Sequence, residues 1–182
     1  MATTTVAQPT QERQGGVTLK GRPVTLVGPE IAVGSKAPDV QVIGVDGSTL
    51  TLAGFKGKTL LINVVHSLDT SICDAQTRRF HEAAAKVPNT EVLTISMDLP
   101  FAQKRWCGAA GLEHVNVASD HRDASFGKAY GVLIKDLRLH ARAIFVIDGQ
   151  GVVRHVEYVP EIASHPKYDA ALAAVKQAGA TR

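Results

Sequence analysis

The segment TLLINVVHSLDTSIC, residues 59–73, decides the fold of this chain. Its first part, Thr59–Val65, is an almost continuous apolar run, which is typical of a strand that other elements cover on both faces. An amphipathic pattern over residues 71–86 predicts a helix that stops near Pro88. Residues 91–97 then repeat the pattern of a buried strand. A strand, a helix and a second strand in this order predict a parallel β-α-β unit at the centre of a sheet.

Working outward from this unit, alternating and amphipathic patterns predict the remaining elements. We expect hairpins over residues 17–27, 40–52 and 143–158, short helices over 101–110 and 124–130, a weaker strand over 115–118 and a closing helix over 166–178. This order predicts an α/β protein with a thioredoxin-like fold, in which helices flank a central mixed sheet, and an N-terminal β-hairpin extension. Residues 1–15 carry few apolar side chains, so we expect a flexible N-terminal arm, followed by a single domain over residues 16–182.

The composition is that of a globular protein and argues against several classes of function. Apolar residues make up 45% of the chain and charged residues 20%. The net charge of +3 is small and the charges are scattered, which argues against a protein that binds nucleic acid or a membrane surface. No apolar run approaches the ~18 residues of a membrane span, and the N-terminus lacks the pattern of a secretory signal. We therefore expect a cytoplasmic protein.

The two cysteines, Cys73 and Cys107, are informative in a reducing compartment. Thiols there more often bind metals or carry out redox chemistry than form structural disulfides. The chain has no Cys-x-x-Cys motif, and its seven histidines show neither an i, i+4 pair on one helix nor short spacing to a cysteine. The sequence therefore favours redox chemistry without a metal.

Cys73 follows the first buried strand at the point where a helix is expected to begin. Asp69, Thr70 and Ser71 are all good N-cap residues, which places Cys73 in the first helical turn. Free backbone N–H groups and the positive end of the helix dipole favour a thiolate there. Thr70, three residues earlier, can turn its hydroxyl toward the same pocket. A cysteine in a helix that faces a sheet can equally be a small buried hydrophobic residue, so the residues alone leave both interpretations open.

Four sequence motifs, spread over most of the chain, carry further information about its function. They are Ser67-Leu-Asp-Thr-x-x-Cys73, Asp98-Leu-Pro-Phe-Ala-Gln103 with Cys107 after it, Ala141-Arg142-Ala143 before the strand Phe145–Asp148, and Pro166-x-Tyr168-x-Ala-Ala-Leu172. Together they resemble the thiol peroxidase branch of the peroxiredoxins, which are atypical two-cysteine enzymes that carry both thiols on one chain. The resemblance runs from about Val17 to Ala178 and includes the family's separation between the cysteines (107 − 73 = 34).

The resemblance implies a role for each candidate residue and a set of partners. Cys73 would attack hydrogen peroxide or an alkyl hydroperoxide, and Cys107 would resolve the resulting sulfenic acid as an intrachain disulfide. Arg142 would hold the thiolate and a peroxide oxygen together, and Thr70 would orient the peroxide. The family also implies thioredoxin as the reductant, a homodimer packed near the active-site loops, an antioxidant role, and no metal or organic cofactor. One position departs from the family pattern, since His66 replaces the proline that lies seven residues before the nucleophile.

Two further expectations concern Cys107 and its neighbour Trp106. If both helices stay intact, we expect the two cysteine Cα atoms to exceed the ~7 Å that a disulfide tolerates, so one of the helices must unwind for the bond to form. Trp106 is interpreted as core packing whose fluorescence reports that movement. The main rival function is a redox sensor that uses the same cysteine pair to change the binding of a partner. A disulfide oxidoreductase is less favoured because Cys-x-x-Cys is absent, and a binding module with structural thiols is less favoured because of the paired motifs.

Overall fold

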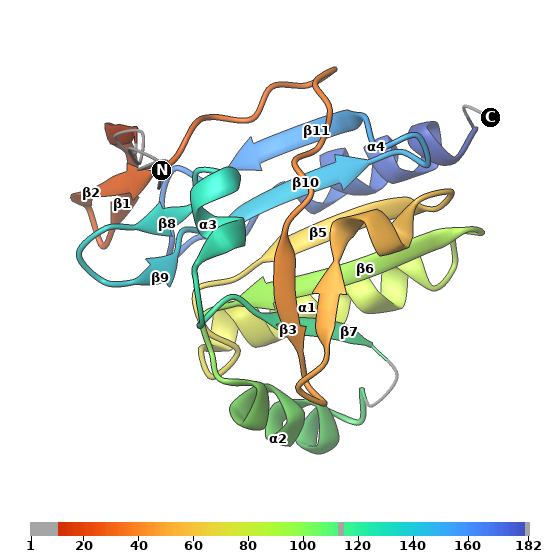
Figure 1. The fold of residues 1–182 in the computed structure, drawn as a ribbon, viewed down its shortest axis with the longest axis horizontal. Helices are drawn as coiled ribbons and strands as arrows, with labels where there is room; N and C mark the ends of the chain where they lie inside the picture. Colours follow the sequence, from red (N-terminus) through yellow and green to blue (C-terminus); the bar gives the residue numbers. More distant parts are fainter. Residues whose placement is uncertain (1–10, 113–114, 181–182) are drawn as a thin grey trace, which may run out of the picture.

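The structure is a computed structural model, and it describes residues 11–112 and 115–180. A mixed sheet of seven strands forms its centre, in the order β11-β10-β5-β6-β7-β3-β4 (Figure 1). These strands are β3 (Gln41–Gly44), β4 (Thr49–Thr51), β5 (Thr59–Val64), β6 (Thr90–Ser96), β7 (Asn116–Ser119), β10 (Ala143–Ile147) and β11 (Val153–Tyr158). Strands β5, β6 and β7 run parallel, whereas β10 is antiparallel to both β5 and β11. The predicted parallel β-α-β unit at the centre of a mixed sheet is confirmed.

Helices cover both faces of this sheet, and successive residues of β5 point to different faces. The helices are α1 (Ser71–Ala84), α2 (Pro100–Ala110), α3 (Ser125–Ala129) and α4 (Tyr168–Ala180), with a short 3-10 helix, η1 (Leu52–Phe55). Leu60 and Ile62 belong to the core layer that contains Phe126 of α3, whereas Leu61 packs in the layer of Phe80 on α1. In Figure 1, α1 and α4 lie behind the sheet and α3 lies in front of it. Burial on both faces explains the continuous apolar run of this strand.

A second sheet of four strands, in the order β1-β2-β8-β9, carries the predicted N-terminal hairpin. Its strands are β1 (Glu12–Leu19), β2 (Arg22–Val27), β8 (Leu133–Ile134) and β9 (Leu139–His140). The sequence pattern does not predict β8 and β9, because strands of two residues are too short to show a period. The predicted helices agree with the observed ones to within two residues at each end.

Strand β1 begins at Glu12, which corrects the expected extent of the flexible arm over residues 1–15. Backbone pairing with β2 orders this exposed segment, and Arg13 Nε donates to the carbonyl oxygen of Gly28 over 3.1 Å. Because backbone hydrogen bonds and an arginine hold the strand, and not a row of buried apolar side chains, hydropathy does not reveal it. The rest of the expected arm, residues 1–10, lies outside the described residues.

Candidate active site

Cys73 lies in the first turn of α1, where the sequence predicts it. Strand β5 ends at Val64, and Thr70 is the N-cap of α1, with extended backbone angles (φ −101°, ψ 142°). The first backbone N–H groups of a helix have no partner inside the helix, so they give this turn a positive partial charge. The Cys73 side chain is fully buried. Its sulfur is therefore held inside the protein at the positive end of a helix.

The sulfur of Cys73 lies against the guanidinium group of Arg142. Arg142 Nη2 donates a hydrogen bond to Cys73 Sγ over 3.4 Å, and Arg142 is only 2% exposed. The sheet register explains this contact: Ala143 of β10 pairs with Val64 of β5, so the residue before β10 meets the end of β5. Within the described residues, no carboxylate forms an ion pair with Arg142. The thiol of Cys73 therefore lies against a buried cation that has no carboxylate partner among these residues.

Gln76 and Asn63 fix the position of Arg142. Arg142 Nη1 donates to Gln76 Oε1, and Arg142 Nε donates to the carbonyl oxygen of Ile162 over 2.9 Å. Gln76 Nε2 donates in turn to Asn63 Oδ1, so the two ends of this amide face different partners and its orientation is fixed. Sequence reasoning missed both residues, although two signals point to them. Gln76 lies one helical turn after Cys73, and Asn63 interrupts the apolar run of β5.

The buried polar chain continues from Asn63 through Thr94 to His81, which lies in the last turn of α1. Asn63 Nδ2 donates to Thr94 Oγ1 over 3.0 Å, and Thr94 Oγ1 lies 3.3 Å from His81 Nε2. Burial lowers the pKa of His81 from its ordinary value of 6.5 to about 4. The imidazole is therefore neutral at neutral pH, and its protonation opposes folding.

We expect the stability of the fold to fall on mild acidification, in part because of His81. The unfolded chain binds a proton at this histidine below about pH 6.5, whereas the folded protein does so only near pH 4. Stability is therefore lost as the pH falls between these values, by about 2 kcal/mol at about pH 5. The measurement is urea unfolding of wild type and His81→Gln at about pH 7.5 and about pH 5. The variant should lose less stability than wild type, and the exposed His165→Gln should behave as wild type; equal losses in wild type and His81→Gln would contradict this role.

Cys107 lies within α2 and shares one apolar cluster with Cys73. The cluster also contains Val65, Leu68, Trp106 and Val117. Both thiols are free in the structure and buried. Burial raises the pKa of the Cys107 thiol, so this thiol stays protonated at neutral pH. The two sulfurs therefore differ in environment, because Cys73 contacts a cation and Cys107 packs among apolar side chains.

Asp98 ties the loop before Cys73 to the segment that leads into α2. Its Oδ1 accepts a hydrogen bond from Ser67 Oγ over 2.8 Å. Its Oδ2 accepts from the backbone N–H of Leu68 and from Ser96 Oγ, both over 2.8 Å. A single carboxylate therefore holds the loop before Cys73 against the end of β6.

Thr70 lies at the entrance of α1, and its hydroxyl is engaged within its own turn. Thr70 Oγ1 donates to the carbonyl oxygen of Ser67 over 2.9 Å, and the side chain is exposed. In the part of the chain that the structure describes, Thr70 makes no hydrogen bond to Cys73. Thr70 thus lies close to Cys73 along the chain, and its oxygen keeps lone pairs that can accept a further hydrogen bond.

Comparison with known proteins assigns this arrangement to a family. Residues 32–172 match the family model Redoxin. A thiol peroxidase from Halalkalibacterium halodurans is 57% identical over 162 residues, which cover 89% of this chain and 98% of that relative. A thiol peroxidase from Bacillus subtilis is 54% identical over 160 residues, which cover 88% of this chain and 96% of the relative. The chain belongs to the thiol peroxidases of the redoxin family.

Solved structures agree with this chain in fold. The crystal structure of a peroxiredoxin-like protein from Aquifex aeolicus is 43% identical, with a TM-score of 0.84 over 91% of this chain and 98% of that chain. A thiol peroxidase from Chromobacterium violaceum is 22% identical, with a TM-score of 0.78 over 85% of this chain and 91% of that chain, and supports the fold alone. The predicted thioredoxin-like fold and the predicted resemblance are both confirmed.

His66 stands in this thiol peroxidase where the family pattern has proline. The ring is partly buried, and its Nδ1 lies 3.1 Å from the carbonyl oxygen of His140. A carbonyl oxygen only accepts, so Nδ1 carries the proton of the neutral ring. Burial lowers the pKa of His66. The histidine therefore fills space beside the active site as a neutral, hydrogen-bonded ring at neutral pH.

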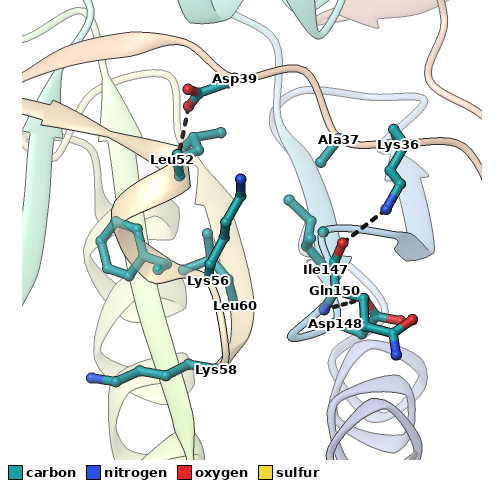
Figure 2. A pocket seen from close by; sticks show the side chains of 13 residues that line it. Lys36, Ala37, Asp39, Leu52, Lys56, Lys58, Leu60, Ile147, Asp148 and Gln150 are labelled. Carbon is teal, nitrogen blue, oxygen red and sulfur yellow. Dashed lines mark hydrogen bonds between the residues drawn. The ribbon is translucent and has the colours of Figure 1, made fainter.

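A pocket of about 280 Å³ lies at the other end of β5 (Figure 2). Its lining includes Lys36, Leu52, Lys56, Leu60 and Ile147. These residues surround the start of β5 and the end of β10, whereas Cys73 follows the end of β5. Figure 2 shows the Lys36 ammonium group directed to the carbonyl oxygen of Gln150, 3.0 Å away. No cysteine lines this pocket, so it is not the site of the thiol chemistry.

The described residues contain neither a metal-binding cluster nor a membrane-spanning helix. Over residues 11–112 and 115–180, no group of three or more His, Cys, Asp or Glu side chains is arranged to hold a metal ion. In the same ranges, every helix is too short or too polar to cross a bilayer.

Proposed function

We propose that this chain reduces hydrogen peroxide and alkyl hydroperoxides, with Cys73 as the nucleophile. The Cys73 thiolate attacks one peroxide oxygen, the O–O bond breaks, and the other oxygen leaves and takes up a proton to give water or an alcohol. Cys73 is oxidised to a sulfenic acid, and the peroxide is reduced. The observation that carries this proposal is the hydrogen bond of 3.4 Å from the buried Arg142 to the sulfur of Cys73.

Arg142 has donors to spare for the peroxide. A guanidinium group carries five N–H bonds. Within the described residues, Arg142 uses three of them to donate hydrogen bonds to Ile162, Gln76 and Cys73. The remaining N–H bonds can donate to the peroxide and stabilise negative charge on the leaving oxygen. Thr70 Oγ1, at the entrance of the helix, accepts a hydrogen bond from the peroxide O–H and so orients the peroxide. Because Cys73 is fully buried, side chains around it must move aside to admit the substrate.

Cys107 then resolves the sulfenic acid. The Cys107 sulfur attacks the sulfur of Cys73, a disulfide bond forms, and the sulfenic oxygen leaves as water with the proton of the Cys107 thiol. Both cysteines lie inside hydrogen-bonded helices in the thiol form of the protein. The first turn of α1, or α2 around Cys107, therefore unwinds for the bond to form. Trp106, beside Cys107, reports this change by its fluorescence.

We further propose that thioredoxin reduces the disulfide, in the cytoplasm, as part of an antioxidant defence. A dithiol protein returns Cys73 and Cys107 to thiols and becomes a disulfide itself, which requires a compartment that keeps dithiols reduced. A homodimer is supported by two exposed apolar side chains at the start of α2, Leu99 (52% exposed) and Phe101 (82% exposed). They lie next to Asp98, which holds the loop before Cys73.

The replacement Cys107→Ser tests the resolving step and the whole cycle. With thioredoxin as reductant, wild type should turn over many times and show an intrachain disulfide by mass spectrometry. With peroxide at about one equivalent per chain, the variant should consume it once and then stall as the sulfenic acid, because no thiol on the chain remains to attack it. Continued turnover of the variant at the wild-type rate would contradict the role of Cys107. A redox sensor with the same cysteines would not sustain turnover even as wild type.

A further inference from the structure

The two helices that carry the cysteines are joined by a hydrogen bond directly beside both of them. Trp106 Nε1 of α2 donates to Asp74 Oδ1 of α1 over 2.9 Å. Asp74 follows Cys73 in the sequence, and Trp106 precedes Cys107. An indole N–H bonded to a carboxylate is a charge-assisted hydrogen bond, which is stronger than a bond between neutral groups. Trp106 is therefore more than the core packing that its sequence context predicts.

Arg78 strengthens this connection from one turn further along α1. Its Nε lies 3.1 and 3.0 Å from the two carboxylate oxygens of Asp74. Its Nη1 donates to the carbonyl oxygen of Ala110, the last residue of α2, over 3.0 Å. The guanidinium also lies over the Trp106 ring, 5.6 Å from the centroid. Arg78 thus links α1 to α2 at two points, Trp106 and the C-terminal residue Ala110.

We propose that Asp74, Arg78 and Trp106 form an interhelix clamp that sets how fast the sulfenic acid of Cys73 is resolved. This inference rests on the proposed function. Local unwinding at either cysteine moves Asp74 away from Trp106 or Ala110 away from Arg78, so the clamp must open before the disulfide can form. The Asp74–Arg78 ion pair is partly exposed, with side-chain exposures of 35% and 41%, and contributes little alone. The donor of the Trp106 hydrogen bond is better shielded from water than the ion pair, since Trp106 is 8% exposed.

The clamp has a chemical consequence because the sulfenic acid has two possible fates. Attack by Cys107 gives the disulfide and water. Attack on a second peroxide molecule gives a sulfinic acid at Cys73, while that peroxide is reduced to water or an alcohol. Slow opening of the clamp prolongs the life of the sulfenic acid and favours the second fate. The clamp therefore sets the peroxide concentration at which the enzyme inactivates itself.

The test compares disulfide and sulfinic acid formation in variants that weaken the clamp. Trp106→Phe keeps an aromatic ring and removes the N–H donor, and Asp74→Asn keeps the shape and removes the charge. Arg79→Met is the matched control, because Arg79 is the next residue of α1 but pairs with Asp169 at 3.7 Å and lies 3.9 Å from the Tyr168 ring centroid on α4. Quenched-flow mass spectrometry gives the rates of thiol loss, disulfide formation and sulfinic acid formation over a series of peroxide concentrations.

We expect both clamp variants to form the disulfide about tenfold faster than wild type, which corresponds to about 1.4 kcal/mol of barrier. The peroxide concentration that gives half sulfinic acid should rise by a similar factor, while the first oxidation of Cys73 and the Arg79→Met control stay as in wild type. Unchanged or slower disulfide formation in folded clamp variants would overturn the clamp. If wild type itself forms neither sulfenic acid nor disulfide, the proposed function fails instead.

Discussion

Replacement of Cys73 by serine should abolish peroxide reduction and leave only the rate measured without protein. Serine has nearly the shape of cysteine, so the buried position is preserved. A serine hydroxyl stays protonated at neutral pH, and beside Arg142 it has no base to activate it, so it cannot attack the O–O bond. The assay is thioredoxin-coupled consumption of hydrogen peroxide and of an alkyl hydroperoxide.

Cys107→Ser is the matched control for this loss. This variant removes the other buried thiol by the same chemical change. Its Cys73 should still be oxidised by peroxide to the sulfenic acid. Thermal unfolding of both variants shows whether the fold survives. Turnover by a folded Cys73→Ser protein above the rate without protein would refute Cys73 as the nucleophile.

Replacement of Arg142 should lower kcat/KM by about 10²–10³-fold, the usual loss when a preorganised donor is removed from an active site. Arg142→Met removes the hydrogen bond to Cys73 and leaves Gln76 Oε1 and the Ile162 carbonyl oxygen without their donor. Part of its effect is therefore a loss of stability. Arg142→Lys keeps the charge, but a single ammonium group cannot reach the three acceptors that the planar guanidinium spans. It should still lose about tenfold or more.

The rate of sulfenic acid formation in a single turnover measures this effect without the later steps. Unfolding curves show whether each variant is folded at the assay temperature. Arg154→Met is a suitable control, because Arg154 pairs with Asp148 on the β10–β11 hairpin and makes no contact with Cys73. A folded Arg142→Met protein with the kcat/KM of wild type would exclude Arg142 from the reaction.

The central part of the fold was predictable because its signals are local. An apolar run followed by N-cap residues placed Cys73 in the first turn of a helix, and the structure has it there. The arm was misjudged because β1 is held by backbone pairing with β2, which leaves no pattern of apolar residues. Strands β8 and β9 were missed for a similar reason, since two residues cannot show a period.

The contacts of the candidate active site depend on sheet register, which a single sequence does not contain. Arg142 reaches Cys73 because Ala143 pairs with Val64, and only the resemblance to a family suggested that these distant segments meet. Gln76 and Asn63 were overlooked because amides in a helix and a strand have many structural roles. Their buried hydrogen bonds to each other and to Arg142 identify them once the segments are placed.

The carboxylate of Asp98 joins the loop before Cys73 to the segment before α2. It holds the backbone of Leu68 on one side and lies directly before α2 on the other. Because Asp98 is bonded to the loop and adjoins the helix, a movement of α2 during disulfide formation would also move the loop before Cys73. The oxidised protein would then present a different outline to solvent from the one that receives peroxide. Peroxide would thus bind one conformation of the chain and the reductant another, so the two would not compete for the same site.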